Sequence, residues 1–281
     1  MGQWFPGHMA RAERELREHL AVIDIVIEVL DARAPLASHN PRIAALWQDK
    51  RHVTVLNKCD LADPGTTAEW LSFFQRQGQQ AVATSGHAKQ SHVLAVIRNL
   101  ADPERARRLG RGVRVMVVGI PNVGKSTLLN ALAGRKGART GARPGVTKGR
   151  QWVRAGDLEI LDLPGVLPAG RHDARREMVL AAIGAIAQDE FSPREVAVWL
   201  LGELLPKAQL ALAARYQLQW EDMEVEAILA RVGKIRGCLR TGGVIDTTAA
   251  AGIVLRDFSL GKLGRVSLEE PPPGNGMQKG N

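Results

Sequence analysis

The chain has 281 residues, 45% of them hydrophobic, which is enough to bury the core of one large domain and a smaller one. Its two cysteines stand far apart, so neither a disulfide scaffold nor a structural zinc site is favoured. The sequence shows no run of eighteen apolar residues and no apolar signal segment at its start. It therefore predicts a cytoplasmic protein without a membrane partner.

Positive charge is unevenly distributed along the chain. The formal net charge is +9, and the surplus of Lys and Arg lies in the first two thirds. Residues 135–154 contain several Arg and Lys and no acidic residue. Such a segment fits a polyanionic partner such as RNA, although a solvated basic face would explain it equally well.

The first part of the chain predicts an α/β architecture. Residues 8–20 combine helix-forming residues with opposite charges four positions apart, which predicts a charged surface helix. After it, short β-branched runs alternate with helical patterns: strands at 22–32, 52–57 and 80–85, and helices at 40–50 and 66–77. This alternation predicts right-handed βαβ units, and therefore a mostly parallel sheet with helices on both faces.

The middle of the chain continues this pattern after a polar, Arg-rich connection at 101–112. A strongly apolar strand is expected at 113–119, followed by a glycine-rich loop and a helix at 125–134. Residues 150–165 predict a β-hairpin.

Long apolar helical patterns predominate from about residue 175 onward and predict a separate all-α domain. The last residues are rich in Pro and Gly, which is typical of a disordered tail. We therefore expect a GTPase-type domain at 1–174, a helical domain at 175–268 and a disordered tail at 269–281.

A phosphate-binding loop is predicted at residues 119–126, GIPNVGKS, which match GxxxxGK[ST] between a predicted strand and a predicted helix. Glycines let backbone N–H groups converge on phosphate oxygens, and the helix N-terminus adds partial positive charge. Lys125 is expected to reach the β- and γ-phosphates, and Ser126 to ligate Mg²⁺. The residues expected to contact the nucleotide here are Asn122, Val123, Gly124, Lys125, Ser126 and Thr127.

Two further segments fit the same phosphate site. In EILDLPGV, Asp162 ends a predicted strand and suits a magnesium contact, while the Gly165 N–H suits the γ-phosphate. Asp-x-Pro-Gly is also an ordinary turn, so its position after the phosphate loop carries this interpretation. Thr147, in TGARPGVTKGR, is the candidate for a switch threonine on magnesium.

A base-binding site is predicted by NKCD at residues 57–60, which follows a strand and fits N/TKxD. Asp60 can accept the paired N–H donors of guanine, which adenine lacks, while Asn57 and Lys58 shape the pocket. Ser85 and Gly86 end the next predicted strand, where a backbone N–H could bind the guanine oxygen. Because ligands bind at the carboxyl ends of parallel strands, these motifs are expected to meet at one edge of the sheet.

The order of the motifs is unusual, because the base motifs precede the phosphate motifs. The chain carries WFPGHMA, DARAP, NKCDL, GIPNVGKST, GVTKG, LDLPGV and GKLGRVSLE in this order. Together they resemble the YlqF/RbgA family, the ribosome biogenesis GTPase A proteins, which are circularly permuted GTPases. The resemblance covers nearly the whole chain.

The resemblance implies a GTP- and GDP-binding enzyme that assists late maturation of the large ribosomal subunit and is stimulated by it. It also implies that the helical domain binds rRNA. The position after DLPG is Val166, which cannot orient water as a Gln does in Ras-like enzymes. The resemblance assigns that role to His8, and it makes Asn122 a candidate ligand of K⁺. We expect a monomer.

Other functions remain open at this point. NKCD argues against a P-loop kinase or ATPase, because adenine would not match Asp60. Val166 leaves room for a nucleotide-dependent RNA-binding scaffold with little hydrolysis. A mitochondrial-type ribosome GTPase of the same family is a further alternative.

Overall fold

A computed structural model describes residues 14, 16–86, 88, 90–134, 151–163, 165, 167, 173–219 and 224–273. In this part of the chain the strands form a single sheet with the order β3-β2-β1-β4-β6-β5. The strands are β1 (Ile25–Asp31), β2 (Arg51–Asn57), β3 (Gln80–Thr84), β4 (Val113–Val118), β5 (Gln151–Ala155) and β6 (Leu158–Asp162). All neighbouring strands pair in parallel except β5 and β6, which form the predicted hairpin.

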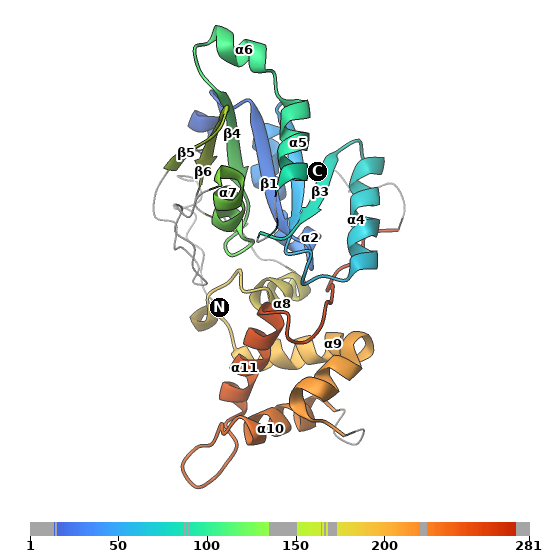
Figure 1. The fold of residues 1–281 in the computed structure, drawn as a ribbon. Coiled ribbons are helices and arrows are strands. Elements are labelled where there is room, and N and C mark those ends of the chain that lie inside the picture. The colour runs from blue at the N-terminus through green and yellow to red at the C-terminus, as the bar shows by residue number, and fades with distance from the viewer. Residues whose placement is uncertain are drawn as a thin grey trace.

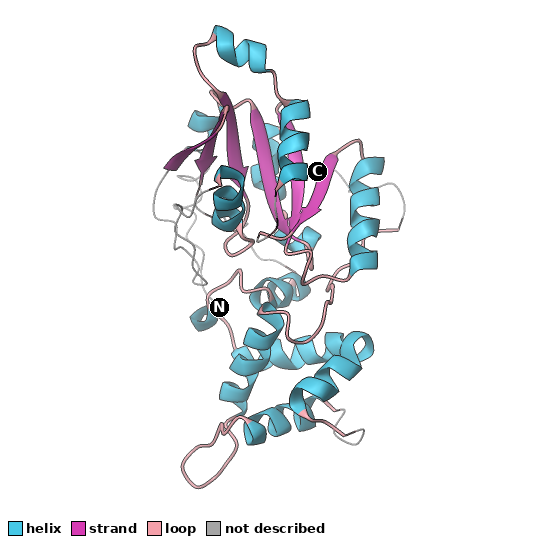
Figure 2. Ribbon diagram, in the orientation of Figure 1, coloured by secondary structure: helices cyan, strands magenta, loops and turns pink. Residues whose placement is uncertain are grey.

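Helices cover both faces of the sheet, as the sequence predicts (Figures 1 and 2). The helices of this part are α2 (Pro35–Ser38), α3 (Pro41–Ala44), the 3₁₀ helix η1 (Ala45–Trp47), α4 (Pro64–Arg76), α5 (Ser91–Leu100), α6 (Pro103–Arg108) and α7 (Lys125–Ala133). Of the predicted helix at 8–20, the described residues 16–20 are helical.

Alternation along β1 divides the core between the two faces of the sheet. Ile25 and Ile27 pack in one cluster with residues of α5 and α7. Val26, whose side chain points to the opposite face, packs with residues 16–20, α3 and η1. Leu30 belongs to a third cluster, with the aromatic residues of α4. The strand β1 and most of β2 and β4 are buried on both sides, which is why these strands read as continuous apolar runs.

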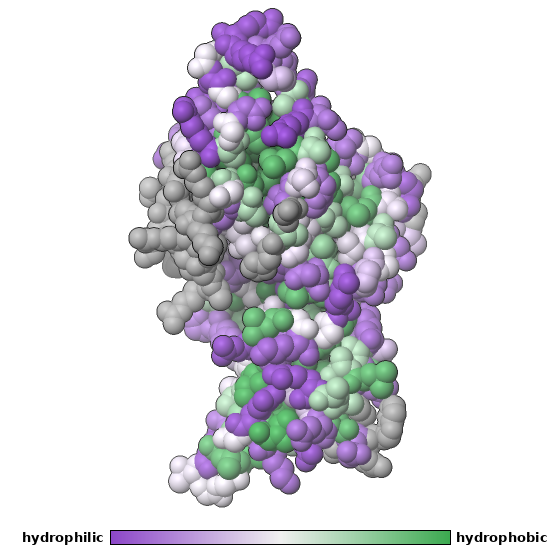
Figure 3. Space-filling model, viewed as in Figure 1, coloured by the Kyte–Doolittle hydropathy of each residue, from purple (hydrophilic) through white to green (hydrophobic). Residues whose placement is uncertain are grey.

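The helices α2, α5 and α6 were not predicted, and α5 and α6 are the longer ones. The segment of α5, SHVLAVIRNL, lies between the predicted strand at 80–85 and the polar connection, and it buries Val93 and Ile97 against the sheet. The connection itself contains α6, which begins at Pro103. Asp102 is its N-cap, and the Asp102 carboxylate accepts a hydrogen bond from the Arg105 N–H. The surface over α6 is strongly hydrophilic (Figure 3).

The helical part follows the sheet in the chain and lies below it in Figure 1. It comprises α8 (Ala174–Ala182), the 3₁₀ helix η2 (Gln188–Glu190), α9 (Pro193–Tyr216), α10 (Val225–Ile235) and α11 (Thr247–Ser259). The helix α9 contains Pro206 and is kinked just after it, where Ala208 has the non-helical dihedral angles φ −138° and ψ 29°.

By length and composition α9 is apolar enough to cross a membrane. It packs against α8, α10 and α11, however, and Leu200, Leu201 and Leu204 are completely buried in the bundle. Its Glu203 also pairs with Arg175 of α8 at 2.8 Å. These contacts are those of the central helix of a bundle.

After α11 the chain leaves the bundle and returns to the sheet beside α4 (Figure 1). Leu263, Val266 and Leu268 are buried on this path. Residues 269–273, which were assigned to the tail, are described, and Glu269 accepts hydrogen bonds from backbone N–H groups of α2. Residues 274–281 lie outside the described part.

Candidate functional site

The predicted base and phosphate motifs follow different strands and meet at one edge of the sheet. NKCD follows β2, Ser85 follows β3, and the phosphate-binding loop follows β4. Because these strands are parallel, their carboxyl ends lie together, and this edge faces the helical bundle (Figure 2).

Asn57 joins the base motif to the phosphate-binding loop. Its Nδ2 atom donates to the Val123 carbonyl at 2.7 Å, although the two residues are 66 positions apart. Gly124 has a φ of 95°, and a Cβ there would lie 2.2 Å from Asn57 Nδ2. Only glycine tolerates both this backbone conformation and this close approach. On the other side of the loop, Gly86 lies against the side chain of Thr127.

Lys125 is buried at the start of α7. Its Nζ atom donates to the Ile120 carbonyl at 2.8 Å, so the ammonium group curls back over its own loop. Burial lowers the pKa of Lys125 to about 8. Gly165 lies against the same loop, because a Cβ there would approach the Pro121 nitrogen to 2.6 Å and Lys125 Nζ to 2.9 Å. The loop, Lys125 and Gly165 thus lie close together at the N-terminus of α7.

Ser126 and Asp162 offer oxygen ligands for a metal ion beside Lys125. The Ser126 hydroxyl donates to Asp162 Oδ2 at 3.1 Å, and the buried Oδ1 atom has no hydrogen-bond partner among the described residues. Burial raises the pKa of Asp162. A buried carboxylate oxygen without a partner next to a hydroxyl fits a hard divalent cation such as Mg²⁺, which prefers oxygen ligands.

The Asn122 side chain connects the phosphate-binding loop to the helical bundle. It has a left-handed φ of 60°, and its Nδ2 atom donates to the Gly184 carbonyl, just after α8, at 2.6 Å. The sequence places a potassium ligand at Asn122, and nothing in its pattern predicts the contact with Gly184.

Lys58 of the base-binding segment belongs to a buried ion triad with Asp31 and Arg33, which the sequence did not predict. Asp31, at the end of β1, pairs with Lys58 at 2.9 Å and with both Nε and Nη2 of Arg33. Burial alone would raise the pKa of Asp31, but the two cations hold it well below its usual range. Asp31 and Arg33 belong to the DARAP motif, which the sequence analysis identified without predicting its ion pairs.

The neighbouring loop is fixed by Gln90, which the sequence did not single out either. Its Nε2 atom donates to the Ser85 carbonyl at 2.8 Å, and its Oε1 atom accepts from the Thr84 hydroxyl at 2.7 Å. The Cys59 N–H donates to the Thr84 carbonyl, which joins this loop to NKCD. Asp60 is exposed and accessible to a ligand. His8 and Thr147 lie outside the described residues.

Replacing Asp31 by Asn should destabilise the fold by about 3 kcal/mol at neutral pH, because Arg33 and Lys58 would remain as a largely buried pair of cations. Urea denaturation at pH 7 measures this difference. The native carboxyl has a lowered pKa, so its contribution is present above about pH 4 and is lost as the pH falls below that value.

The difference between the native chain and the Asp31→Asn variant should therefore shrink at pH 3. The matched control is Asp24→Asn, because Asp24 pairs with Arg111 in a more accessible position. This substitution should lower the free energy of unfolding by about 1 kcal/mol. Equal losses in the two variants would contradict the importance of the buried triad.

Comparison with known proteins gives a consistent result. The model of a family described as "50S ribosome-binding GTPase" matches residues 114–211. The ribosome biogenesis GTPase A of Priestia megaterium is 41% identical over 278 residues, which cover 96% of each chain. The mitochondrial ribosome-associated GTPase 1 of Ictalurus punctatus is 31% identical, over 96% of this chain and 92% of the relative.

Among solved structures, the crystal structure of GNP-bound YlqF from Thermotoga maritima superimposes with a TM-score of 0.69 and 27% identity. The match covers 92% of this chain and 98% of that chain. It confirms the predicted fold class, an α/β domain with a mostly parallel sheet followed by helices. With identity near 40% over almost the whole length, the chain belongs to the ribosome biogenesis GTPase A family.

Proposed function

We propose that this chain binds GTP, hydrolyses it to GDP and phosphate, and assists late maturation of the large ribosomal subunit, which stimulates its turnover. The observation that supports this most strongly is the contact of Asn57 with the phosphate-binding loop. It brings a guanine-type base motif and a phosphate motif, separate in the sequence, into a single nucleotide site.

In this proposal Asp60 accepts the N1 and N2 hydrogens of guanine, while Asn57 and Lys58 shape the pocket. Backbone N–H groups at Ser85 and Gly86 bind the guanine oxygen. Asp60 is exposed but lies next to Lys58, whose ammonium group is held by the buried Asp31. A carboxylate at this position selects guanine over adenine because adenine has no matching pair of donors.

The phosphate groups would lie against residues 122–127 at the N-terminus of α7, where backbone N–H groups and the helix dipole favour anions. Lys125 must exchange its bond with the Ile120 carbonyl for the β- and γ-phosphates. The Gly165 N–H would donate to the γ-phosphate. Ser126, Asp162 and Thr147 would hold Mg²⁺, which supplies charge neutralisation of the phosphates when bound.

Hydrolysis requires a residue that positions the attacking water, and Val166 cannot do so. We assign this role to His8, whose imidazole can accept a proton near neutral pH. The Asn122 amide oxygen is proposed as a K⁺ ligand, since the amide nitrogen already donates to Gly184.

The proposed partners are the large subunit and its rRNA. Residues 1–174 would form the GTPase domain, and residues 175–268 the rRNA-binding helical domain. The surplus of positive charge in the first two thirds of the chain supports contact with a polyanion. We propose a cytoplasmic monomer, and we favour a bacterial-type protein because the identity is 41% to the Priestia relative and 31% to the mitochondrial one.

The decisive experiment measures GTP hydrolysis with and without purified bacterial large subunits, in potassium and in sodium buffers. We expect stimulation of about a hundredfold or more by the subunit, with a faster rate in potassium, because positioned charges and water contribute only in the assembled site. Small subunits are the matched control. Absence of stimulation together with absence of co-sedimentation would refute the ribosomal role. Equal rates in the two buffers would refute only the proposed activation by potassium.

A further inference from the structure

The motif GKLGRVSLE was noted in the sequence without a role, and the structure places it against the base-binding segment. Residues 260–269, which we name the C-terminal strap, run from the end of α11 past residues 57–63 to α2. The strap begins with a turn at residues 260–263 and then runs without regular secondary structure from the bundle to the sheet, with Leu263 and Val266 buried (Figure 1).

Arg265 makes two hydrogen bonds to the base-binding segment. Its Nη2 atom donates to the Cys59 carbonyl at 2.8 Å, and its Nε atom donates to the Ala62 carbonyl at 3.0 Å. The two carbonyls flank Asp60 and Leu61 in the chain. A single guanidinium group therefore spans the turn that presents the Asp60 carboxylate, and its planar shape suits this two-point contact.

The rest of the strap continues this contact along the same turn. The Val266 N–H donates to the Leu61 carbonyl at 3.0 Å, and the Asp63 N–H donates to the Ser267 hydroxyl at 3.2 Å. Gly261 lies so close to the Leu61 side chain that a Cβ there would approach it to 2.5 Å.

On its inner side the same turn is held by the sheet. Lys58 has a left-handed φ of 61° and pairs with Asp31, and the Cys59 N–H donates to the Thr84 carbonyl. The turn is thus clamped between β-sheet contacts and strap contacts. Asp60 itself is exposed, so its orientation depends on the residues that surround it.

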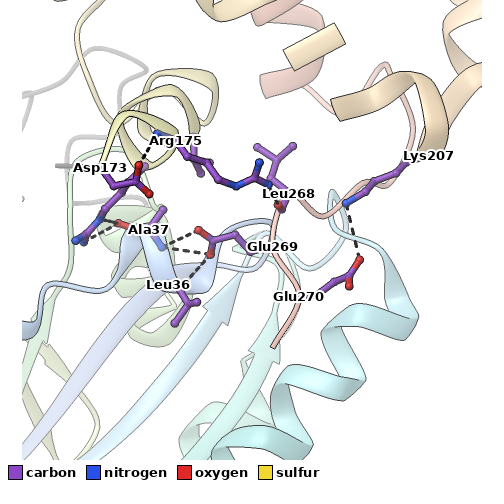
Figure 4. A pocket seen from close by; sticks show the side chains of 10 residues that line it. Leu36, Ala37, Asp173, Arg175, Lys207, Leu268, Glu269 and Glu270 are labelled. Atoms are coloured by element: carbon purple, nitrogen blue, oxygen red, sulfur yellow. Dashed lines mark hydrogen bonds and ion pairs between the residues drawn. The ribbon is translucent and has the colours of Figure 1, made fainter. Parts of the chain in front are cut away.

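The strap is anchored at both of its ends. Near its start, Arg33 donates to the Phe258 carbonyl at 3.3 Å and lies over the Phe258 ring. Near its end, the Glu269 carboxylate accepts from the Leu36 and Ala37 N–H groups (Figure 4). The first anchor connects the DARAP motif with the last helix of the bundle, and the second connects the strap with α2.

The bundle also reaches the strap directly. Lys207 of α9 donates to the Ser267 carbonyl at 3.2 Å, and Arg175 of α8 donates to the Leu268 carbonyl at 3.4 Å. Both side chains line a cavity of about 590 Å³ beside Glu269 (Figure 4). Through these contacts the position of the strap depends on the position of the bundle.

We propose that the C-terminal strap sets the position of the guanine-reading turn, and that Arg265 is the positioning residue through which the helical bundle controls guanine selectivity. The inference rests on the proposed function, because it takes Asp60 as the guanine-reading residue. A strap that served only as a staple between the two parts would affect stability without changing base discrimination.

The test compares GDP with IDP, which lacks the 2-amino group of guanine. In the native chain the GDP/IDP affinity ratio reports how well Asp60 accepts the N2 hydrogens. We expect Arg265→Ala to lower GDP affinity by about tenfold, because the turn must then be ordered by the nucleotide itself. The ratio should come close to that of Asp60→Ala, because the Asp60 carboxylate is then no longer held where it accepts the N2 hydrogens. Arg265→Lys should give an intermediate ratio, since one ammonium group cannot reproduce the planar two-point contact.

A double-variant comparison separates a strap that positions Asp60 from a strap that only stabilises the fold. If Arg265 acts through Asp60, adding Arg265→Ala to Asp60→Ala should leave the GDP/IDP ratio unchanged. The matched control is Arg256→Ala, an exposed arginine on α11, which should keep the native ratio. Urea denaturation of each variant verifies folding, and Arg265→Lys carries the test if Arg265→Ala does not fold.

A native GDP/IDP ratio in the folded Arg265 variants, together with a lowered ratio in Asp60→Ala, would overturn the role of the strap while leaving the proposed function intact. An unchanged ratio in Asp60→Ala would instead refute the guanine-reading role of Asp60, and the strap proposal with it.

Discussion

Asp60→Asn should change the base preference of the site from guanine to xanthine. We expect the affinity for GDP to fall by about a thousandfold, because the two guanine donors lose a charged acceptor and one of them then faces the donor group of the Asn amide. Xanthine carries a carbonyl oxygen where guanine carries the 2-amino group, and this oxygen can accept a hydrogen bond from the Asn amide nitrogen. The affinity for XDP should therefore rise. Competition of GDP and XDP for the variant, measured by calorimetry, gives both affinities.

Asp49→Asn is the matched control for this variant. Asp49 is an exposed aspartate just before β2, at the end of the strand opposite to Asp60, so its replacement should leave both affinities unchanged. Retention of native GDP affinity in Asp60→Asn, without any gain for XDP, would show that another group reads the base.

His8→Ala should lower the subunit-stimulated rate of GTP hydrolysis by about a thousandfold, which is the middle of the range for loss of a general base. The affinity for GTP should not change, because none of the proposed base or phosphate contacts involves His8. Single-turnover hydrolysis with saturating large subunits measures the chemical step, and nucleotide binding is measured separately.

His52→Ala provides the control, since His52 lies near the start of β2, away from the nucleotide edge. A stimulated rate in His8→Ala equal to that of the native chain would exclude His8 as the residue that positions water. A loss of GTP affinity in parallel with the rate would indicate that His8 supports binding instead.

Most of the strands could be predicted because their signals are local. The apolar run before the phosphate-binding loop predicted 113–119, and β4 covers Val113–Val118. The first strand was predicted over 22–32 but is shorter, Ile25–Asp31, because Val22 lies in the turn that follows residues 16–20. Element ends depend on neighbouring contacts, so a pattern alone places them only approximately.

The unpredicted helices show where local signals were ambiguous. The segment of α5 contains Val93, Val96 and Ile97, and such β-branched residues fit a strand as well as a buried helix. In α6 the Arg residues suggested a linker, although Asp102 and Pro103 supply a good helix start. The helix ends before Gly110, which adopts a φ of 65°.

The sequence by itself determined which chemical groups follow each strand: an Asn and an Asp after β2, a glycine-rich loop with a lysine after β4, and an Asp at the end of β6. Parallel pairing then required these groups to meet, because the carboxyl ends of neighbouring parallel strands share one edge. The base and phosphate motifs could therefore be assigned to a single site before any contact was known.

Only the tertiary structure decided how these groups are held. The contact of Asn57 with Val123, the Asp31 triad and the grip of Arg265 on the turn around Asp60 join residues that are distant in the chain or carry no periodic signal. Arg265 is 206 positions from Cys59, and no local pattern relates an arginine to a carbonyl at that separation. Hydrogen bonds to backbone carbonyls depend on the path of the chain in space rather than on the type of the accepting residue, so the contacts of the strap follow from the packing of the bundle against the sheet.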